Sequence, residues 1–192
     1  MLIGFHGTSY QNAKEILRHG FTEDHFPDWT SDLGRGAYGY IAVPEMPFAT
    51  PTHIAAEYAR LKADMHGYGQ ADRRASGNPR ISVVEFRVDV ADEDICDFNN
   101  PEQYRTLIGL KRRFEAFIHA ERTFTSGAAY RDNEDGILIE YLIRKRLMRD
   151  YHLMVMDTYT PLFAKMSNFA NGREICVRHI GLISKVDLYR RK

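Results

Sequence analysis

The sequence predicts an α+β fold, because segments with the period of a strand and segments with the period of a helix follow one another in irregular order. Residues 81–90 alternate between apolar and polar side chains, which is typical of a strand with one buried face. The segment after Pro101 instead repeats its apolar residues at helical spacing. A doubly wound parallel sheet would need stricter alternation of strands and helices. The 192 residues suit one domain, so we expect residues 1–192 to form a single unit.

The N-terminal segment is expected to form a strand, a turn and a helix. Residues 2–5 are a short apolar run, and Thr8 and Ser9 can cap a helix that follows. Gly20 can take the left-handed conformation that ends such a helix. The expected buried face carries Ala13, Ile16 and Leu17.

The next segment, residues 22–50, has no clean period and is predicted to be an irregular loop. Loops of this length in a compact domain are often functional. Residues 51–62 are predicted to be a helix with Ile54, Tyr58 and Leu61 on one face. Residues 63–80 are polar and rich in glycine, so we expect an excursion from the domain and not a linker.

The second half is predicted to contain two helices and three further strands besides the strand at 81–90. One long helix follows Pro101, with an apolar stripe made of Leu107, Leu110, Phe114 and Phe117. Another runs from about 135 to 148 and carries a basic run, 144–146, that we interpret as a solvated face. The expected strands are 153–156, 174–178 and 183–189.

Composition limits the class of protein. Hydrophobic residues make up 44% of the chain, enough for a core, and 26 basic residues balance 26 acidic ones. No global field therefore attracts nucleic acid or an anionic membrane. Cys96 and Cys176 lie in apolar, strand-like surroundings and are interpreted as buried free thiols of a reducing compartment. The chain shows no basic leader, no apolar run of spanning length and no metal-ligand spacing of histidines or cysteines. We therefore expect a protein of the cytoplasm, of the producing cell or of a target cell after export without a cleaved signal, with no membrane partner and no metal.

Gly34, Gly36 and Gly39 match the dinucleotide-binding pattern G-x-G-x-x-G literally. That pattern needs a strand immediately before it and a helix that opens on it. Polar residues precede these glycines, and Pro44 and Pro47 follow closely. We therefore reject a Rossmann site here.

Three other segments give no evidence of a function when each is considered alone. His6-Gly7-Thr8 lies where a strand meets a helix, Gly34-Arg35-Gly36-Ala37-Tyr38 is a glycine-rich loop that ends in an aromatic residue, and Glu174 opens a strand near the end of the chain. Taken singly, they are best interpreted as a turn histidine, a flexible turn with a core tyrosine, and a solvated strand end.

In this order and spacing, the three segments resemble the poly(ADP-ribose) polymerase-like branch of the ADP-ribosyltransferases, of the His-Tyr-Glu type. The family pattern continues into a helix with Ala and Tyr, here Ala55-Ala56-Glu57-Tyr58-Ala59, and extends from residue 5 to residue 189. The chain looks most similar to small bacterial and phage-related members that lack regulatory domains. The resemblance implies a split, bent antiparallel β-sheet with flanking helices and with NAD in the cleft.

The resemblance also implies a catalytic set of Glu174, His6 and Tyr38. His6 would bind a ribose hydroxyl, Tyr38 would lie against the cationic nicotinamide ring, and Glu174 would bind the 2′-hydroxyl of the nicotinamide ribose and stabilise the oxocarbenium-like centre. NAD would also be held by the small or hydroxyl-bearing residues of the first two segments, namely Gly7, Thr8, Gly34 and Gly36. Two positions depart from the family. Gly39 replaces an aromatic residue, which would loosen the ring pocket, and Gly172 replaces the Glu or Gln of arginine-modifying toxins.

The implied reaction is the transfer of a single ADP-ribose from NAD to a macromolecule, because the chain has no room for polymer-extending segments. The resemblance favours a protein acceptor over RNA or DNA, and suggests a toxin, an effector or a defence protein with an antitoxin or immunity partner. Two alternatives stay open: an NAD glycohydrolase on the same scaffold, and an inactive domain that binds nucleotide, RNA or protein.

Overall fold

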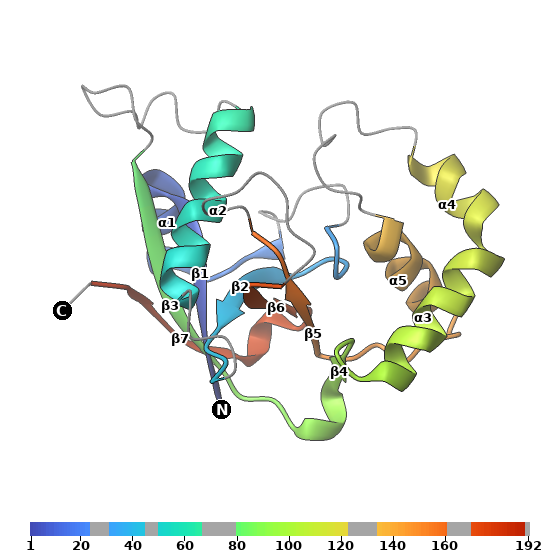
Figure 1. The fold of residues 1–192 in the computed structure, drawn as a ribbon. Helices are drawn as coiled ribbons and strands as arrows, with labels where there is room; N and C mark the ends of the chain where they lie inside the picture. Colours follow the sequence, from blue (N-terminus) through green and yellow to red (C-terminus); the bar gives the residue numbers. More distant parts are fainter. Residues whose placement is uncertain (24–30, 45–49, 67–79, 123–133, 161–169, 191–192) are drawn as a thin grey trace.

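The computed structural model describes residues 1–23, 31–44, 50–66, 80–122, 134–160 and 170–190. Within these residues, seven strands form one sheet in the order β4-β5-β6-β2-β1-β3-β7, and five α-helices pack around it (Figure 1). The fold is therefore α+β, as the sequence predicts. None of the helices in the described ranges is both long and apolar enough to span a bilayer.

The chain begins with β1 (Leu2–Ser9), followed at once by α1 (Tyr10–His19). The Ser9 hydroxyl caps α1 by accepting a hydrogen bond from the Asn12 amide at 3.1 Å, and Gly20 ends the helix with φ +75°. The expected strand, cap and glycine stop are present, but the expected turn at His6-Gly7-Thr8 is wrong, because these residues continue β1 up to the helix cap. Gly20 has a positive φ, but its ψ of −171° lies outside the expected left-handed helical conformation. Ala13 and Ile16 are buried, but Leu17 is 40% exposed, so its assignment to the buried face is wrong.

The predicted loop 22–50 contains a strand, β2 (Ala37–Ile41), that was not predicted from the sequence. Ala37, Gly39 and Tyr40 of this strand are buried, so no alternation of apolar and polar residues marks it. The strand follows the glycines of the rejected G-x-G-x-x-G match, where a dinucleotide fold would have a helix. The helix α2 (Pro51–His66) comes next and is one turn longer than predicted. Most of the polar excursion at 63–80 lies outside the described residues.

The middle of the chain contains β3 (Ile81–Val88), a 3₁₀ turn η3 (Asp92–Asp94), the short strand β4 (Ile95–Asp97), α3 (Pro101–Arg113) and α4 (Glu115–Arg122). Val84, Phe86 and Val88 are fully buried, which confirms the predicted alternation. The predicted long helix after Pro101 is two helices, because Phe114 leaves the helical conformation at φ −107°, ψ +15°. The strand β4 is a further element that was not predicted from the sequence.

The last part contains α5 (Glu134–Arg144), β5 (Leu153–Thr158), β6 (Gly172–Val177), the 3₁₀ turn η4 (Ile180–Leu182) and β7 (Ile183–Leu188). The three predicted strands are all present. The helix α5 ends four residues earlier than predicted, at a turn in which Arg146 has φ +56°. Arg144, Lys145 and Arg146 are exposed, as expected of a solvated face.

Neighbouring strands run antiparallel except at one edge, where β4 pairs with β5 in parallel. The sheet is therefore mixed, and the expected purely antiparallel sheet is wrong at that edge. The polypeptide reaches β4 from β3 and returns to β5 only after three helices, the kind of long crossover that parallel strands need.

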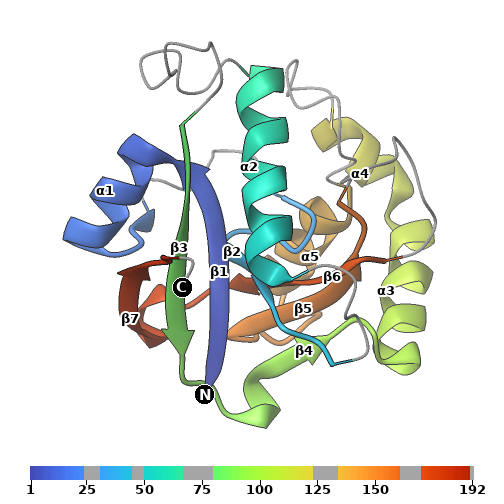
Figure 2. The same cartoon turned by 60° about the vertical axis from the view of Figure 1, so that its left-hand side comes forward.

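The sheet is strongly bent, so β1 and β3 cross β5 and β6 at a steep angle (Figure 2). Phe86 and Val88 of β3 pack in one apolar cluster with residues of β5 and β6, although two strands separate β3 from β6 and three separate it from β5 in the sheet order. The pairing is shortest at the junction of β1 and β2. These strands share two paired positions, Gly4–Ile41 and Phe5–Tyr40, whereas β1 and β3 pair along all of β1.

Candidate functional site

The three residues of the predicted catalytic set lie on consecutive strands of the sheet. Glu174 is in β6, Tyr38 in β2 and His6 in β1. Tyr38 pairs with Cys176 and Tyr40 pairs with Glu174, so these side chains leave the same face of the sheet. His6 follows the last paired position of β1 and β2, where the two strands part. Phe5 pairs with Tyr40, so the side chain of the next residue, His6, leaves the opposite face of the sheet from Tyr38 and Glu174.

His6 and Tyr38 are in direct contact. The Nδ1 atom of His6 lies 2.8 Å from the backbone carbonyl oxygen of Tyr38. A carbonyl oxygen only accepts, so Nδ1 carries the proton and Nε2 is the acceptor of the neutral ring. Burial lowers the pKa of His6, and the hydrogen bond to the carbonyl opposes this effect. The ring also packs edge-to-face on Phe21, with centroids 5.5 Å apart. His6 is therefore a neutral imidazole in a defined tautomer.

The phenol of Tyr38 is tethered to its own loop. Its hydroxyl donates to the carbonyl of Gly34 at 2.7 Å and accepts from the amide of Leu33 at 2.8 Å. Burial, followed by the nearby Cys176 and Glu174, raises the pKa of Tyr38 well above its usual range. The hydroxyl therefore stays protonated, and the half-buried ring is the part of this side chain that a ligand can contact.

Glu174 is almost completely buried, with 1% of its surface exposed. It is flanked by Tyr40 of β2 and Met156 of β5, its partners across the sheet. The Tyr40 hydroxyl in turn lies 3.0 Å from the Thr160 hydroxyl, another buried polar group. A buried carboxylate is rare unless it is paired or hydrogen-bonded. Glu174 is thus not the solvated strand end that its sequence context allowed.

A cavity of about 230 Å³ lies where β1 and β2 part. His6 and Thr8 of β1 form one wall, and Gly36 to Tyr38 form another. The third wall comes from α1 and the residues after it, namely Asn12, Glu15, Ile16, Phe21 and Thr22. The structure therefore gathers four predicted NAD-binding residues, His6, Thr8, Gly36 and Tyr38, around one cavity. Glu174, the third residue of the predicted catalytic set, does not line this cavity.

Gly7 and Gly34 do not line this cavity, and each glycine has a structural role elsewhere. A β-carbon on Gly7 would collide with the carbonyl oxygen of Ala55, so the glycine lets α2 pack directly on β1. Gly34 has φ +87°, a conformation that glycine adopts without strain. Gly36, which does line the cavity, is also tightly packed, because a β-carbon there would lie 2.6 Å from the Cys176 sulfur.

Gly39 does not loosen the pocket around the tyrosine ring, contrary to the expectation from the sequence. A β-carbon at this position would lie 2.7 Å from the ring of Phe86. Gly39 alternates with Tyr38 along β2, so it faces away from that ring. Phe86 fills the space that the missing side chain leaves.

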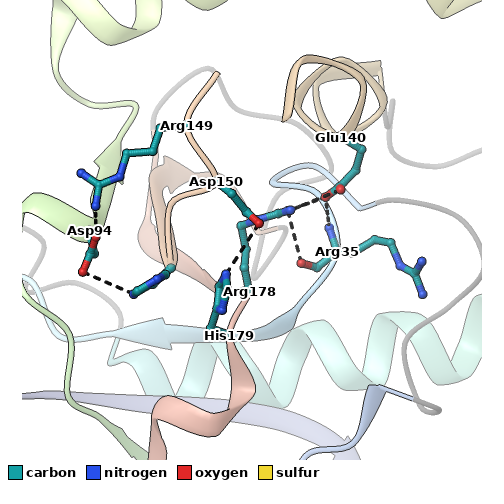
Figure 3. A network of polar contacts seen from close by, with 8 residues as sticks. Arg35, Asp94, Glu140, Arg149, Asp150, Arg178 and His179 are labelled. Carbon is teal, nitrogen blue, oxygen red and sulfur yellow. Dashed lines mark hydrogen bonds and ion pairs between the residues drawn. The ribbon is translucent and has the colours of Figure 1, made fainter. Parts of the chain in front are cut away.

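The glycine-rich loop is held from outside by an ion-pair network (Figure 3). The amide of Arg35 donates to the Glu140 carboxylate of α5 at 2.7 Å, and the Arg35 carbonyl accepts from Arg178 at 3.4 Å. Arg178 also binds both carboxylate oxygens of Glu140, and its Nε donates to Asp150 at 3.0 Å. Burial lowers the pKa of Arg178, but its bonds to Glu140 and then to Asp150 outweigh this and raise it. We call Arg178, Glu140 and Asp150 the loop brace.

A second group of ion pairs continues from the loop brace. His179 lies 3.7 Å from Asp150 and packs against His152, with ring centroids 4.4 Å apart and ring planes tilted by 51°. His152 lies 3.3 Å from Asp94, which also binds Arg149. In the ranges that the structure describes, no group of three or more His, Cys, Asp or Glu side chains could hold a metal ion.

Two parts of this site were not predicted from the sequence: the wall formed by α1 and the loop brace. Asn12, Glu15 and Ile16 share one helical face at spacings of three and four, so the helix period could have identified the wall. Glu140 and Arg178 are 38 residues apart, and no local pattern connects them.

The comparisons with known proteins identify no family for this chain. No protein-family model matches it, and no curated protein matches it.

Proposed function

We propose that this protein is an NAD-dependent mono-ADP-ribosyltransferase on a split-sheet ADP-ribosyltransferase fold. The observation that carries the proposal is the cavity at the parting of β1 and β2, whose lining includes His6 and Tyr38, with Glu174 on the next strand. Neutral His6 offers Nε2 as an acceptor for a ribose hydroxyl. The half-buried ring of Tyr38 offers an aromatic face to a cationic pyridinium. Together these groups suit a nicotinamide riboside.

In the proposed reaction, the bond between the pyridinium nitrogen and C1′ of the ribose breaks, and its electron pair leaves with neutral nicotinamide. A lone pair of the acceptor forms the new bond to C1′, and the acceptor loses its proton to solvent. Glu174 stabilises the positive charge that develops on the ribose, provided that its carboxylate contacts the ring. The carboxylate is buried in the free protein, so the proposal requires substrate binding to open the packing beside Tyr40.

The test uses NAD labelled in the adenosine half together with a cell lysate. We expect release of nicotinamide and transfer of label to a macromolecule, and we expect Glu174→Gln to slow both by about 10²–10³-fold, the effect of removing one group that stabilises the transition state. The matched control is Asp187→Asn on the outermost strand, where the carboxylate is 53% exposed and the rate should not change.

The outcomes separate the alternative functions. Nicotinamide release without a labelled macromolecule would select the NAD glycohydrolase. Loss of the label on treatment with protease or with nuclease would identify a protein or a nucleic acid acceptor. Absence of both NAD binding and nicotinamide release would overturn the proposal and leave a binding domain without this activity.

A further inference from the structure

We propose that Glu140 and Arg178 are positioning residues of the proposed transferase, because they fix the glycine-rich loop that presents Tyr38 to the cavity and thereby set the affinity for NAD. This inference rests on the proposed function, since it concerns how the substrate of that reaction is bound. Neither side chain lines the cavity, so both act through the loop and not by touching NAD.

The two side chains hold the backbone of Arg35 at both of its polar groups. Glu140 accepts a hydrogen bond from the Arg35 amide at 2.7 Å, and Arg178 donates to the Arg35 carbonyl at 3.4 Å. Glu140 and Arg178 also bind each other (Figure 3). Glu140 comes from α5 and Arg178 directly follows β6, so the loop is fixed between a helix and a strand.

Glycines allow α5 and this ion pair to lie directly against the loop. A β-carbon on Gly34 would collide with the Glu140 carboxylate and would lie 2.8 Å from Nη1 of Arg178. A β-carbon on Gly136 of α5 would collide with the carbonyl oxygen of Ser31, just before the loop. Because the contacts are this close, the position of α5 determines the position of the loop backbone.

The loop in turn determines where two residues of the cavity lie. The Tyr38 hydroxyl is bonded to Leu33 and Gly34, and the Tyr38 carbonyl accepts from Nδ1 of His6 at 2.8 Å. A displaced loop would therefore move both rings that line the cavity. If the loop adopts the binding arrangement only part of the time, the apparent dissociation constant rises in proportion.

The experiment measures kcat and KM for NAD from the release of nicotinamide, in the wild-type protein and in Glu140→Ala. This variant loses the acceptor of the Arg35 amide and a partner of Arg178. We expect KM to rise about tenfold and kcat to change by less than about twofold, because saturating substrate restores the bound arrangement. Glu140→Gln keeps an acceptor for the Arg35 amide, so its KM should rise only about threefold.

KM separates positioning from stability, because partial unfolding lowers the concentration of active protein and hence the apparent kcat, but not KM. Hydrogen exchange of the amides of residues 34–38 gives a second readout that needs no activity, and Glu140→Ala should accelerate it. The matched control is Lys111→Met. Lys111 binds Glu134 and Asp135 at the start of α5 at 3.0 and 2.9 Å, and it is 28% exposed, against 25% for Glu140. This control should leave KM and loop exchange unchanged.

The possible results distinguish this inference from the proposed function. If the wild-type protein consumes NAD but Glu140→Ala changes only kcat, or Lys111→Met raises KM equally, the positioning role is overturned and the transferase stands. Unchanged exchange of the loop amides in Glu140→Ala would also overturn the positioning role alone. If Glu140→Ala does not fold, the KM and loop exchange of Glu140→Gln decide in its place. A wild-type protein that neither binds nor consumes NAD would overturn the transferase, and the inference with it.

Discussion

Replacement of Glu140 by Gln tests whether the loop brace stabilises the fold. The change keeps the shape of the side chain and an acceptor for the Arg35 amide, but removes the charge that Arg178 binds through both carboxylate oxygens. At a separation of 3.3 Å, two unit charges attract by about 5 kcal/mol at an effective dielectric constant of about 20.

The expected loss is smaller than this attraction. Arg178 keeps Asp150 at 3.0 Å, and the amide oxygen of the introduced glutamine would still accept hydrogen bonds. The Arg178 and Glu140 side chains are 9% and 25% exposed, so solvent screens the pair only in part. We therefore expect the free energy of unfolding to fall by about 2 kcal/mol, near the cost of losing a hydrogen bond to a charged group.

The assay is unfolding in urea at pH 7, monitored by far-ultraviolet circular dichroism. The free energy of unfolding should depend on urea concentration with the same slope in the variant and in the wild-type protein. The control is again Asp187→Asn, because Lys185 and Asp187 form an ion pair in which both side chains are about half exposed. That variant should change stability by less than about 0.5 kcal/mol. Equal effects of the two variants would refute the reasoning that burial makes the Glu140 pair stronger.

Three further predictions follow from single groups. Burial raises the pKa of Cys96 and of Cys176 to about 12, so at pH 8 both thiols should react with a thiol reagent only after denaturation; rapid reaction of the native protein would contradict their burial. The pKa of His6 is lowered in the folded state from 6.5, so the unfolded chain takes up the proton first as pH falls. Stability should thus be lost below about pH 6.5, by at most about 1.4 kcal/mol per unit, and His6→Asn should flatten this part of the stability profile. Arg146 has φ +56°, so Arg146→Gly should be about 1 kcal/mol more stable than Arg146→Ala in thermal or urea unfolding; equal stabilities would mean that no strain is relieved.

The elements that sequence periodicity predicted best are those with one buried face and a recognisable end. β3 alternates buried and polar residues, and α1 begins at Ser9 and ends at Gly20, so local side-chain chemistry defines both. The same reasoning failed for β2, which is buried on both faces and short. It also failed at Phe114, where an apolar stripe continues across a break between two helices.

The candidate site could be predicted only in part. The resemblance named His6, Thr8, Gly36 and Tyr38, which the structure brings to one cavity. It also assigned Gly7 to NAD, whereas the structure places the Ala55 carbonyl against it. A glycine leaves space beside the backbone, but the sequence does not specify which group, a ligand or another segment of the chain, occupies that space.

The sequence by itself determined the α+β class, most of the strands and helices, the burial of the two thiols and the solvated basic run, because each follows from side chains within a few positions of one another. Only the tertiary structure decided which strands are neighbours, that one edge pair is parallel, that Glu174 is buried and that α1 closes the cavity beside His6. Those features depend on pairing and packing between segments far apart in the chain. Their energies arise from contacts that no local period encodes.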